Sequence, residues 1–170
     1  MLKTPKLEFG ERVKLDSKDK KILELLQTDG RMPISKISRK TSIPRDSVKY
    51  RIRRLEKLNV IRFYHAFLNP AKLGYPMYSY TTFKLYHLDE KREKEFINFL
   101  NSIKQVVYIS KTTGAWDVAI GICARDFKDF DDVLREIRSK FADEIKDIET
   151  GSVIQEFKGD YMADLIEENE

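Results

Sequence analysis

The sequence predicts an α+β protein in which an N-terminal winged helix-turn-helix is followed by a ferredoxin-like βαββαβ domain. Apolar residues recur at helical spacing in three short segments before residue 60, and strand-like and helix-like segments alternate after residue 76. The charge also changes sign along the chain. Residues 1–75 hold 19 Lys and Arg against 8 Asp and Glu, whereas residues 76–170 hold 13 against 20. We therefore expect a basic domain joined to an acidic one.

The composition narrows the class of protein. A chain of 170 residues can form one average domain or two small ones. It has no apolar run of the roughly 18 to 20 residues that a membrane span needs, and its polar opening lacks the apolar segment of a secretory signal. We expect a cytoplasmic protein with no membrane partner. The single cysteine, Cys123, and two histidines, His65 and His87, exclude a disulfide framework and an ordinary zinc site, so no metal and no cofactor are expected.

The first domain is expected over residues 15–69, after an N-terminal arm of residues 1–14. Asp16 or Ser17 can cap its first helix, because the side chains of Asp and Ser accept hydrogen bonds from backbone N–H groups of the first turn. This helix is expected to end at the Asp-Gly pair near residue 29.

Two further helices are expected in this domain. The second is short and ends near Lys40, and Pro44 opens the third, because the N–H that proline lacks would be unpaired in the first turn of a helix. Asn59, a residue that tolerates positive φ, is expected to end the third helix. Lys and Arg occupy much of its circumference, and its apolar stripe consists of Val48, Ile52, Leu55 and Leu58.

The β-branched and aromatic residues of segment 60–68 predict a strand or small hairpin, which would be the wing. Turn-forming residues over 70–76 predict the linker between the domains. The second domain is expected over residues 77–158, and an acidic tail follows over residues 159–170. The expected strands and helices of the second domain, in βαββαβ order, cover residues 77–86, 90–101, 106–111, 116–124, 126–141 or 129–141, and 145–157.

This order places both helices on one face of an antiparallel sheet. Residues 118–123, Val-Ala-Ile-Gly-Ile-Cys, are apolar or small at successive positions, so both faces of the strand they form are apolar. Monomers rarely leave a large apolar sheet face in water. We therefore expect a partner subunit on the open face of the sheet.

An ordered set of motifs resembles the Lrp/AsnC family over about residues 15–158. In the basic half it comprises Leu15-Asp16, Asp19, Ile22-Leu23, Ser47-Val48, Arg51 to Glu56, Ile61 to Tyr64, Ala66, Leu68-Asn69-Pro70 and Leu73-Gly74-Tyr75. In the acidic half it comprises Thr113-Gly114-Ala115-Trp116-Asp117, which resembles the T-G-x-aromatic-D turn of the family, and the last strand, Glu149-Thr150 to Val153-Ile154 with Glu156 and Lys158.

The resemblance implies a transcription regulator, in which an N-terminal DNA reader is joined to a domain that responds to a small molecule. It implies homodimers that often assemble into octamers or other rings, with double-stranded DNA and a small-molecule effector as partners. Three positions depart from the pattern of the family. Ser42 and Asn59 stand where it usually has Gly, and Pro44 stands where it has a Ser or Thr cap. These changes affect turns and capping more than chemistry.

The third helix carries the candidate DNA contacts. A recognition helix inserts near its N-terminus into the major groove, where Arg pairs with guanine and Ser can donate or accept hydrogen bonds. The residues expected to read bases are Arg45, Ser47 and Arg51. The residues expected to contact phosphates are Lys49, Tyr50 and Arg54. In a dimer, two such helices would meet half-sites about one helical turn, roughly 34 Å, or a multiple of it, apart.

The turn at residues 113–117 is the candidate effector site. Gly114 would let a ligand approach the backbone, Thr113 offers a hydroxyl, and Asp117 offers a carboxylate to an ammonium group. The resemblance implies that amino-acid effectors bind near this turn, between dimers. We therefore expect a small amino acid or a related metabolite in contact with these three residues. The alternative is a structural turn in which Asp117 accepts hydrogen bonds from local N–H groups.

Three competing classes of protein differ in what they require. No enzyme is expected, because the sequence has no Gly-rich phosphate loop, no helix-borne metal pair and no nucleophile with a plausible base. An RNA-recognition sheet would need a basic-Gly-aromatic motif on its third strand, and the acidic half lacks one. A nucleoid-organising protein that wraps DNA with low sequence specificity shares the fold and the charge pattern, and it stays open as the alternative function.

Overall fold

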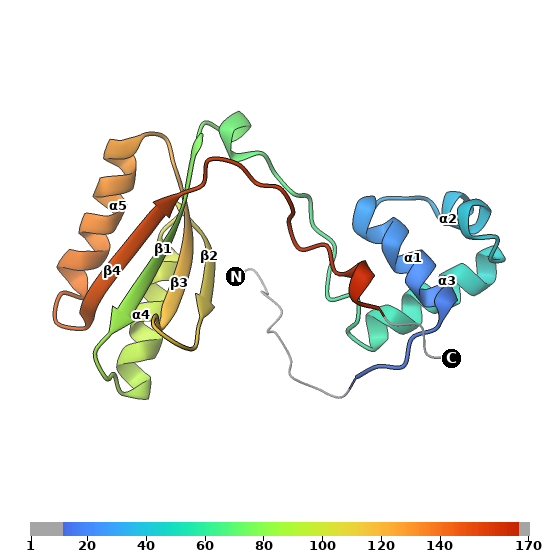
Figure 1. The fold of residues 1–170 in the computed structure, drawn as a ribbon, viewed down its shortest axis with the longest axis horizontal. Helices are drawn as coiled ribbons and strands as arrows, with labels where there is room; N and C mark the ends of the chain where they lie inside the picture. Colours follow the sequence, from blue (N-terminus) through green and yellow to red (C-terminus); the bar gives the residue numbers. More distant parts are fainter. Residues whose placement is uncertain (1–11, 167–170) are drawn as a thin grey trace. The chain divides into compact units, whose positions relative to one another are not determined.

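A computed structural model describes residues 12–166 of the protein. The chain divides into two compact units (Figure 1). The first unit combines the residues up to Phe67 with those from Phe157 onward, and the second is Leu68–Glu156. The sequence suggests a separate tail over residues 159–170. In the structure, the described part of that tail belongs to the N-terminal unit.

Three helices, α1 (Ser17–Thr28), α2 (Ile34–Thr41) and α3 (Arg45–Lys57), form the body of the N-terminal unit. Residues 42–44 join α2 to α3, and this short connection makes the pair a helix-turn-helix. The core of the unit is made by apolar residues of all three helices and of the turns between them: Ile22, Met32, Ile37, Ile43 and Val48.

The ends of these helices follow from particular residues. Asp16 caps α1, since its carboxylate accepts hydrogen bonds from the backbone N–H groups of Lys18 and Asp19 at 2.9 Å each. Ser42 ends α2 and Asn59 follows α3, both in the left-handed region at φ 57°. A positive φ is the backbone conformation that usually favours glycine, and Asn is among the other residues that tolerate it.

The strand or hairpin expected over residues 60–68 is not formed. The described chain between α3 and the 3₁₀-helix η1 (Pro70–Leu73) contains no strand. Its composition favours an extended backbone, but a strand also needs a neighbouring backbone to pair with. The N–H groups of Val60 and Ile61 instead donate to the carbonyl oxygen of Leu55. Further along, Phe63, Phe67 and Leu68 are left exposed.

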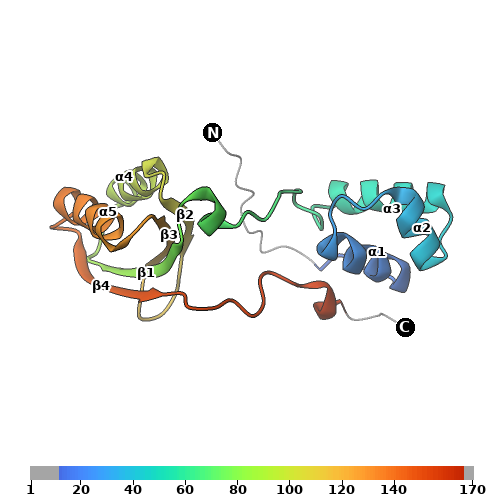
Figure 2. The ribbon, with the colours of Figure 1, turned by 90° about the horizontal axis from the view of Figure 1, so that it is seen from above.

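The second unit has the expected βαββαβ order. Its elements are β1 (Met77–Leu85), α4 (Glu90–Ser102), β2 (Val106–Lys111), β3 (Val118–Ala124), α5 (Phe127–Lys140) and β4 (Ile145–Ser152). The strands form one antiparallel sheet in the order β2-β3-β1-β4. Figure 2 shows α4 and α5 on the same face of this sheet. The unit is thus the two-layer sandwich that the sequence predicted.

The core of the second unit lies between the sheet and these helices. Phe83 of β1 and Ile120 and Ile122 of β3 are fully buried in it. The ring of Phe96 on α4 packs edge-on against Phe83 and Phe141, with centroids 5.6 and 5.0 Å apart. Every second residue of the central strands therefore packs against the helices, and the residues between them point to the open face of the sheet.

β4 is shorter than the strand expected over residues 145–157. It is an edge strand, and its neighbour β1 begins at Met77, directly after Pro76. The last bond between them runs from the N–H of Val153 to the carbonyl oxygen of Tyr78, at 2.8 Å. Beyond this point β1 offers no further partner, so the chain leaves the sheet.

The open face of the sheet is aromatic and nearly free of charge at its centre. Tyr80 of β1 pairs with Gly121 of β3, which pairs in turn with Tyr108 of β2, and residues paired in this way point to the same face. Tyr80 and Tyr108 are exposed. A side chain at Gly121 would meet the Tyr78 hydroxyl at 2.8 Å, so the glycine lets the Tyr78 ring lie across β3. Such a surface suits a protein partner.

Three other features bear on function. None of the described helices is long and apolar enough to cross a membrane. The described residues include no group of three or more His, Cys, Asp or Glu side chains placed to hold a metal ion. Cys123 is buried, and burial raises the pKa of its thiol, which keeps it in the less reactive neutral form.

Candidate functional site

The candidate DNA surface is built on α3. Its apolar stripe turns inward, with Val48 and Leu55 fully buried and Ile52 half-buried. Helical geometry therefore turns the opposite side of α3 to solvent. Asp46 lies in the first turn, where a negative charge interacts favourably with the helix dipole.

Four exposed side chains define the outer face of α3, namely Arg45, Lys49, Tyr50 and Arg53, and the exposed carboxylate of Asp46 lies on the same side of the helix. Tyr50 is 69% exposed. The three cations are spaced one turn apart, over about 12 Å of helix, and none forms an ion pair with another described residue. Arg53 was not among the expected contacts, although its spacing of four from Lys49 could have identified it. These positive groups are available to a polyanion.

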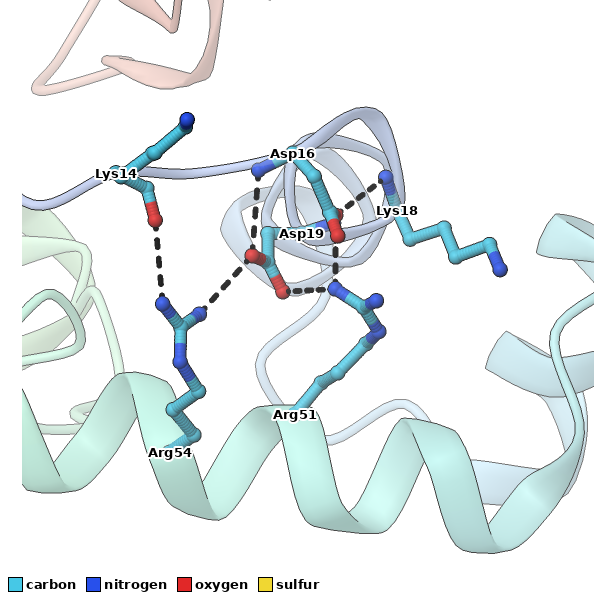
Figure 3. Close-up of polar contacts among 6 residues, drawn as sticks. All are labelled: Lys14, Asp16, Lys18, Asp19, Arg51 and Arg54. Carbon is cyan, nitrogen blue, oxygen red and sulfur yellow. Dashed lines mark hydrogen bonds and ion pairs between the residues drawn. The ribbon is translucent and has the colours of Figure 1, made fainter. Parts of the chain in front are cut away.

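Arg51 and Arg54, by contrast, turn toward α1 (Figure 3). A nitrogen of Arg51, Nη1, lies 2.7 Å from Oδ1 of Asp16 and 2.7 Å from Oδ1 of Asp19. Nη1 of Arg54 lies 3.1 Å from Oδ2 of Asp19, and Nη2 donates to the Lys14 carbonyl oxygen at 3.2 Å. The Asp19 side chain is only 1% exposed. We call these four side chains, Asp16, Asp19, Arg51 and Arg54, the α1–α3 ion cluster.

Two members of the ion cluster, Asp16 and Arg51, have shifted pKa values. Burial raises the pKa of Asp16, but hydrogen bonds from the Asp19 backbone N–H and from Arg51 outweigh it and hold the pKa below its usual range. Burial also opposes the charge of Arg51, yet Asp19 and Asp16 together raise the pKa of its guanidinium. Both groups are therefore charged at neutral pH, and the cluster is an ionic contact between α1 and α3 at that pH.

The remaining part of the helix-turn-helix adds positive charge. Ser47 is half-buried near the start of α3, between the outer face and the ion cluster. Helix α2 carries Lys36, Arg39 and Lys40, all exposed, and no carboxylate. In helix-turn-helix proteins the first helix of the pair crosses the DNA backbone. These α2 cations, which the sequence-based candidates omitted, therefore suit contacts to phosphates.

The turn between β2 and β3 holds the residues expected to bind an effector. Gly114 has φ +105°, a conformation that other residues rarely adopt, and Thr113 and Gly114 are exposed. The Thr112 side chain donates to the carbonyl oxygen of Trp116 at 2.7 Å, which closes the turn. The expected residues therefore lie together on one hydrogen-bonded turn.

Asp117 already has partners within its own unit. Its Oδ2 accepts a hydrogen bond from the Leu85 backbone N–H at 2.8 Å, and its Oδ1 accepts one from the Lys84 ammonium at 3.1 Å. The hydrogen bond from the Leu85 N–H lowers the pKa of Asp117, burial raises it, and the Lys84 ammonium lowers it further. The net effect holds the pKa of Asp117 below its usual range. This geometry favours a structural role for the carboxylate, and it leaves Thr113 and the Gly114 backbone as the accessible groups of the turn.

The variant Asp117→Asn should lower the stability of the second unit at neutral pH, because it removes the charge from these bonds. The folded pKa of Asp117 lies below the unfolded value of about 3.9, so its contribution is present above that pH. It is lost as the pH falls through the folded pKa. Urea unfolding followed by Trp116 fluorescence should give a lower midpoint for the variant than for the wild type at pH 7. The two midpoints should converge as the pH falls below the folded pKa of Asp117. Equal midpoints at pH 7 would contradict this role.

Family models match both units. The model of the AsnC-type helix-turn-helix domain matches residues 15–56, and the model of the Lrp/AsnC ligand binding domain matches residues 80–163. The first match contains the outer face of α3 and the ion cluster. The second contains the turn at residues 113–117.

Relatives extend over most of the chain. An HTH-type transcriptional regulator of Pyrococcus horikoshii is 34% identical over 141 residues, which is 83% of this chain and 87% of the relative. The proline dehydrogenase transcriptional activator of Rhizobium radiobacter is 33% identical over 122 residues, 72% of this chain and 78% of the relative. The solved structure of a transcriptional regulator from Neisseria meningitidis in complex with L-Met has a TM-score of 0.78 at 21% identity, and the alignment covers 90% of this chain and all of that one.

Proposed function

The chain belongs to the Lrp/AsnC family of transcription regulators, and we propose that it recognises specific DNA sequences through α3 under the control of a small amino acid. The observation that carries the DNA part is the outer face of α3, where three cations without ion pairs among the described residues flank an exposed tyrosine. An unpaired cation gives up no internal partner when it meets a phosphate or a guanine.

The roles on α3 divide accordingly. Arg45 lies nearest the N-terminus of the helix, where base edges are reached, and Ser47 follows in the same first turn. Lys49, Tyr50 and Arg53 follow along the outer face and suit phosphates or the groove wall. Arg51 and Arg54 act in this proposal through Asp19, as residues that position α3 on α1, and their direct contact with DNA is secondary.

The test is a selection from a pool of random DNA duplexes, followed by affinity measurements on the enriched sequence. Specific regulators bind their sites at least about a thousandfold more tightly than competitor DNA, and affinity falls steeply with salt when several phosphates are contacted. We expect both results. Enrichment of no sequence, with equal affinity for all duplexes, would instead support the nucleoid-organising alternative.

The effector part of the proposal rests on the turn at residues 113–117. An ammonium or carboxylate group of an amino acid can bond to the Thr113 hydroxyl and to the exposed backbone of Gly114. The regulator of similar fold from Neisseria meningitidis was solved with L-Met, which supports an amino acid as the class of ligand. Calorimetry against the twenty amino acids tests this, and silence toward all of them would refute it.

The open face of the sheet supports a homodimer. Its exposed tyrosines, Tyr80 and Tyr108, would be buried against the same face of a second copy, because a two-fold axis repeats one surface on both subunits. Light scattering should give a mass that is an even multiple of 20.1 kDa. A monomer at micromolar concentration would rule the dimer out.

A further inference from the structure

The C-terminal segment returns to the DNA-binding unit after the chain has left the sheet. The amide oxygen of Gln27, near the end of α1, accepts hydrogen bonds from the backbone N–H groups of Met162 and Ala163 at 2.9 and 2.7 Å. The amide nitrogen of the same residue donates to the Asp160 carbonyl oxygen at 2.6 Å. One side chain thus holds three backbone groups of this segment.

Burial supports this docking. Ala163, the first residue of the 3₁₀-helix η2 (Ala163–Leu165), is 2% exposed, whereas its neighbours Met162 and Leu165 are exposed to solvent. In Figure 2, α1 separates η2 from α3. The docked segment therefore leaves the outer face of α3 accessible. It is an anchor on α1 and does not compete with DNA for the basic surface.

The anchor adds a second connection between the DNA-binding unit and the unit that holds the sheet. The first connection runs from Tyr64, whose hydroxyl donates to Glu56 at 3.3 Å, to Pro70, where η1 lies against β1. These 6 residue steps can span at most about 20 Å. The second runs from Val153, which is still bonded to β1, to Asp160, and these 7 steps span at most about 24 Å. With two short connections at separate points, the DNA-binding unit cannot turn freely about either of them.

We propose that residues 160–166 are a latch that limits how far each DNA-binding unit can turn relative to its sheet, and so narrows the half-site spacings that a pair of units accepts. This inference rests on the proposed function as a sequence-specific dimer. A freely tethered pair of readers would tolerate several spacings, because a flexible connection adapts to each at little cost. A short second tether on each unit removes that tolerance.

Two variants release the latch without touching the core of the three helices. Gln27→Leu removes all three hydrogen bonds, and Ala163→Arg places a long charged side chain where a methyl group is buried. The matched controls are Lys21→Ala, at an exposed position of the same helix, and Leu165→Arg, which adds the same charge to the same segment at a residue that is 77% exposed.

Hydrogen exchange in the full-length protein shows whether the latch is formed. The Met162 and Ala163 amides should exchange at least about tenfold more slowly in the wild type and the controls than in the release variants. Equally fast exchange in the wild type would show that no latch exists.

Selection from the random duplex pool shows what the latch does. The wild type and the controls should enrich paired half-sites at one spacing, and the release variants should also enrich pairs shifted by about 10 base pairs, one helical turn. The same single spacing in variants with fast amide exchange would refute the limiting role. Failure of the wild type to enrich any sequence would overturn the proposed function, whereas the exchange measurement would still decide whether the latch forms.

Discussion

Replacing Arg45, Lys49 and Arg53 together by alanine should lower the affinity for the selected duplex at least about a hundredfold while the protein stays folded. These side chains are exposed and have no ion pairs with described residues, so the substitutions leave the packing of the three helices unchanged. Alanine is also a better helix former than either Arg or Lys. The slope of log affinity against log salt should fall by about one for each phosphate that the variant no longer binds.

A matched triple variant separates this effect from the change in net charge. Lys91, Lys94 and Lys104 are exposed on and after α4 in the second unit, and none has an ion pair with another described residue. Their replacement by alanine lowers the net charge of the chain by three, as the outer-face variant does. The control should keep at least about a third of the wild-type affinity, since distant charges are screened at physiological salt. Equal decreases in affinity for the two triple variants would refute α3 as the DNA-reading helix.

The fold could be predicted from the sequence because its elements are decided locally. The helical spacing of Val48, Ile52 and Leu55 predicts α3 without any knowledge of its neighbours. Ser42 and Asn59, which have a left-handed backbone conformation, stand close to the expected helix ends. The errors concern strand pairing, which depends on a partner. Residues 60–68 have strand composition but no neighbouring strand, and β4 ends where β1 begins. Amino-acid composition alone shows neither the lack of a pairing partner for residues 60–68 nor the point at which β4 ends.

The candidate site was predictable in its location and less so in its individual contacts. Six polar or cationic positions on one helix identify a binding surface, but the sequence does not show that Arg51 and Arg54 face Asp19 on another helix. The pairing joins residues more than thirty positions apart. The latch is hidden for the same reason, since Gln27 and Ala163 are distant in sequence and neither is unusual by itself.

Asp19→Ala should destabilise the N-terminal unit by about 2–4 kcal/mol and leave the second unit unchanged. The variant deprives Arg51 and Arg54 of a carboxylate that is 1% exposed, and it removes an acceptor of the Asp16 backbone N–H. Trp116 is the single tryptophan and lies in the second unit, so its fluorescence reports that unit alone. Circular dichroism at about 222 nm, where helices absorb, also detects α1 to α3. The urea transition should therefore move to lower concentration by circular dichroism but not by fluorescence.

Asp46→Ala is the matched control. Asp46 is exposed on α3, and its interaction with the helix dipole stabilises the protein by only about 0.3–1 kcal/mol. If the circular dichroism transition of Asp19→Ala moved no further than that of the control, the ion cluster would not hold α1 and α3 together, and Arg51 and Arg54 would again be candidates for direct DNA binding. With the expected result, weak DNA binding by an Arg51→Ala, Arg54→Ala double variant is explained by a loosened α3. Only the outer-face variants then test recognition itself.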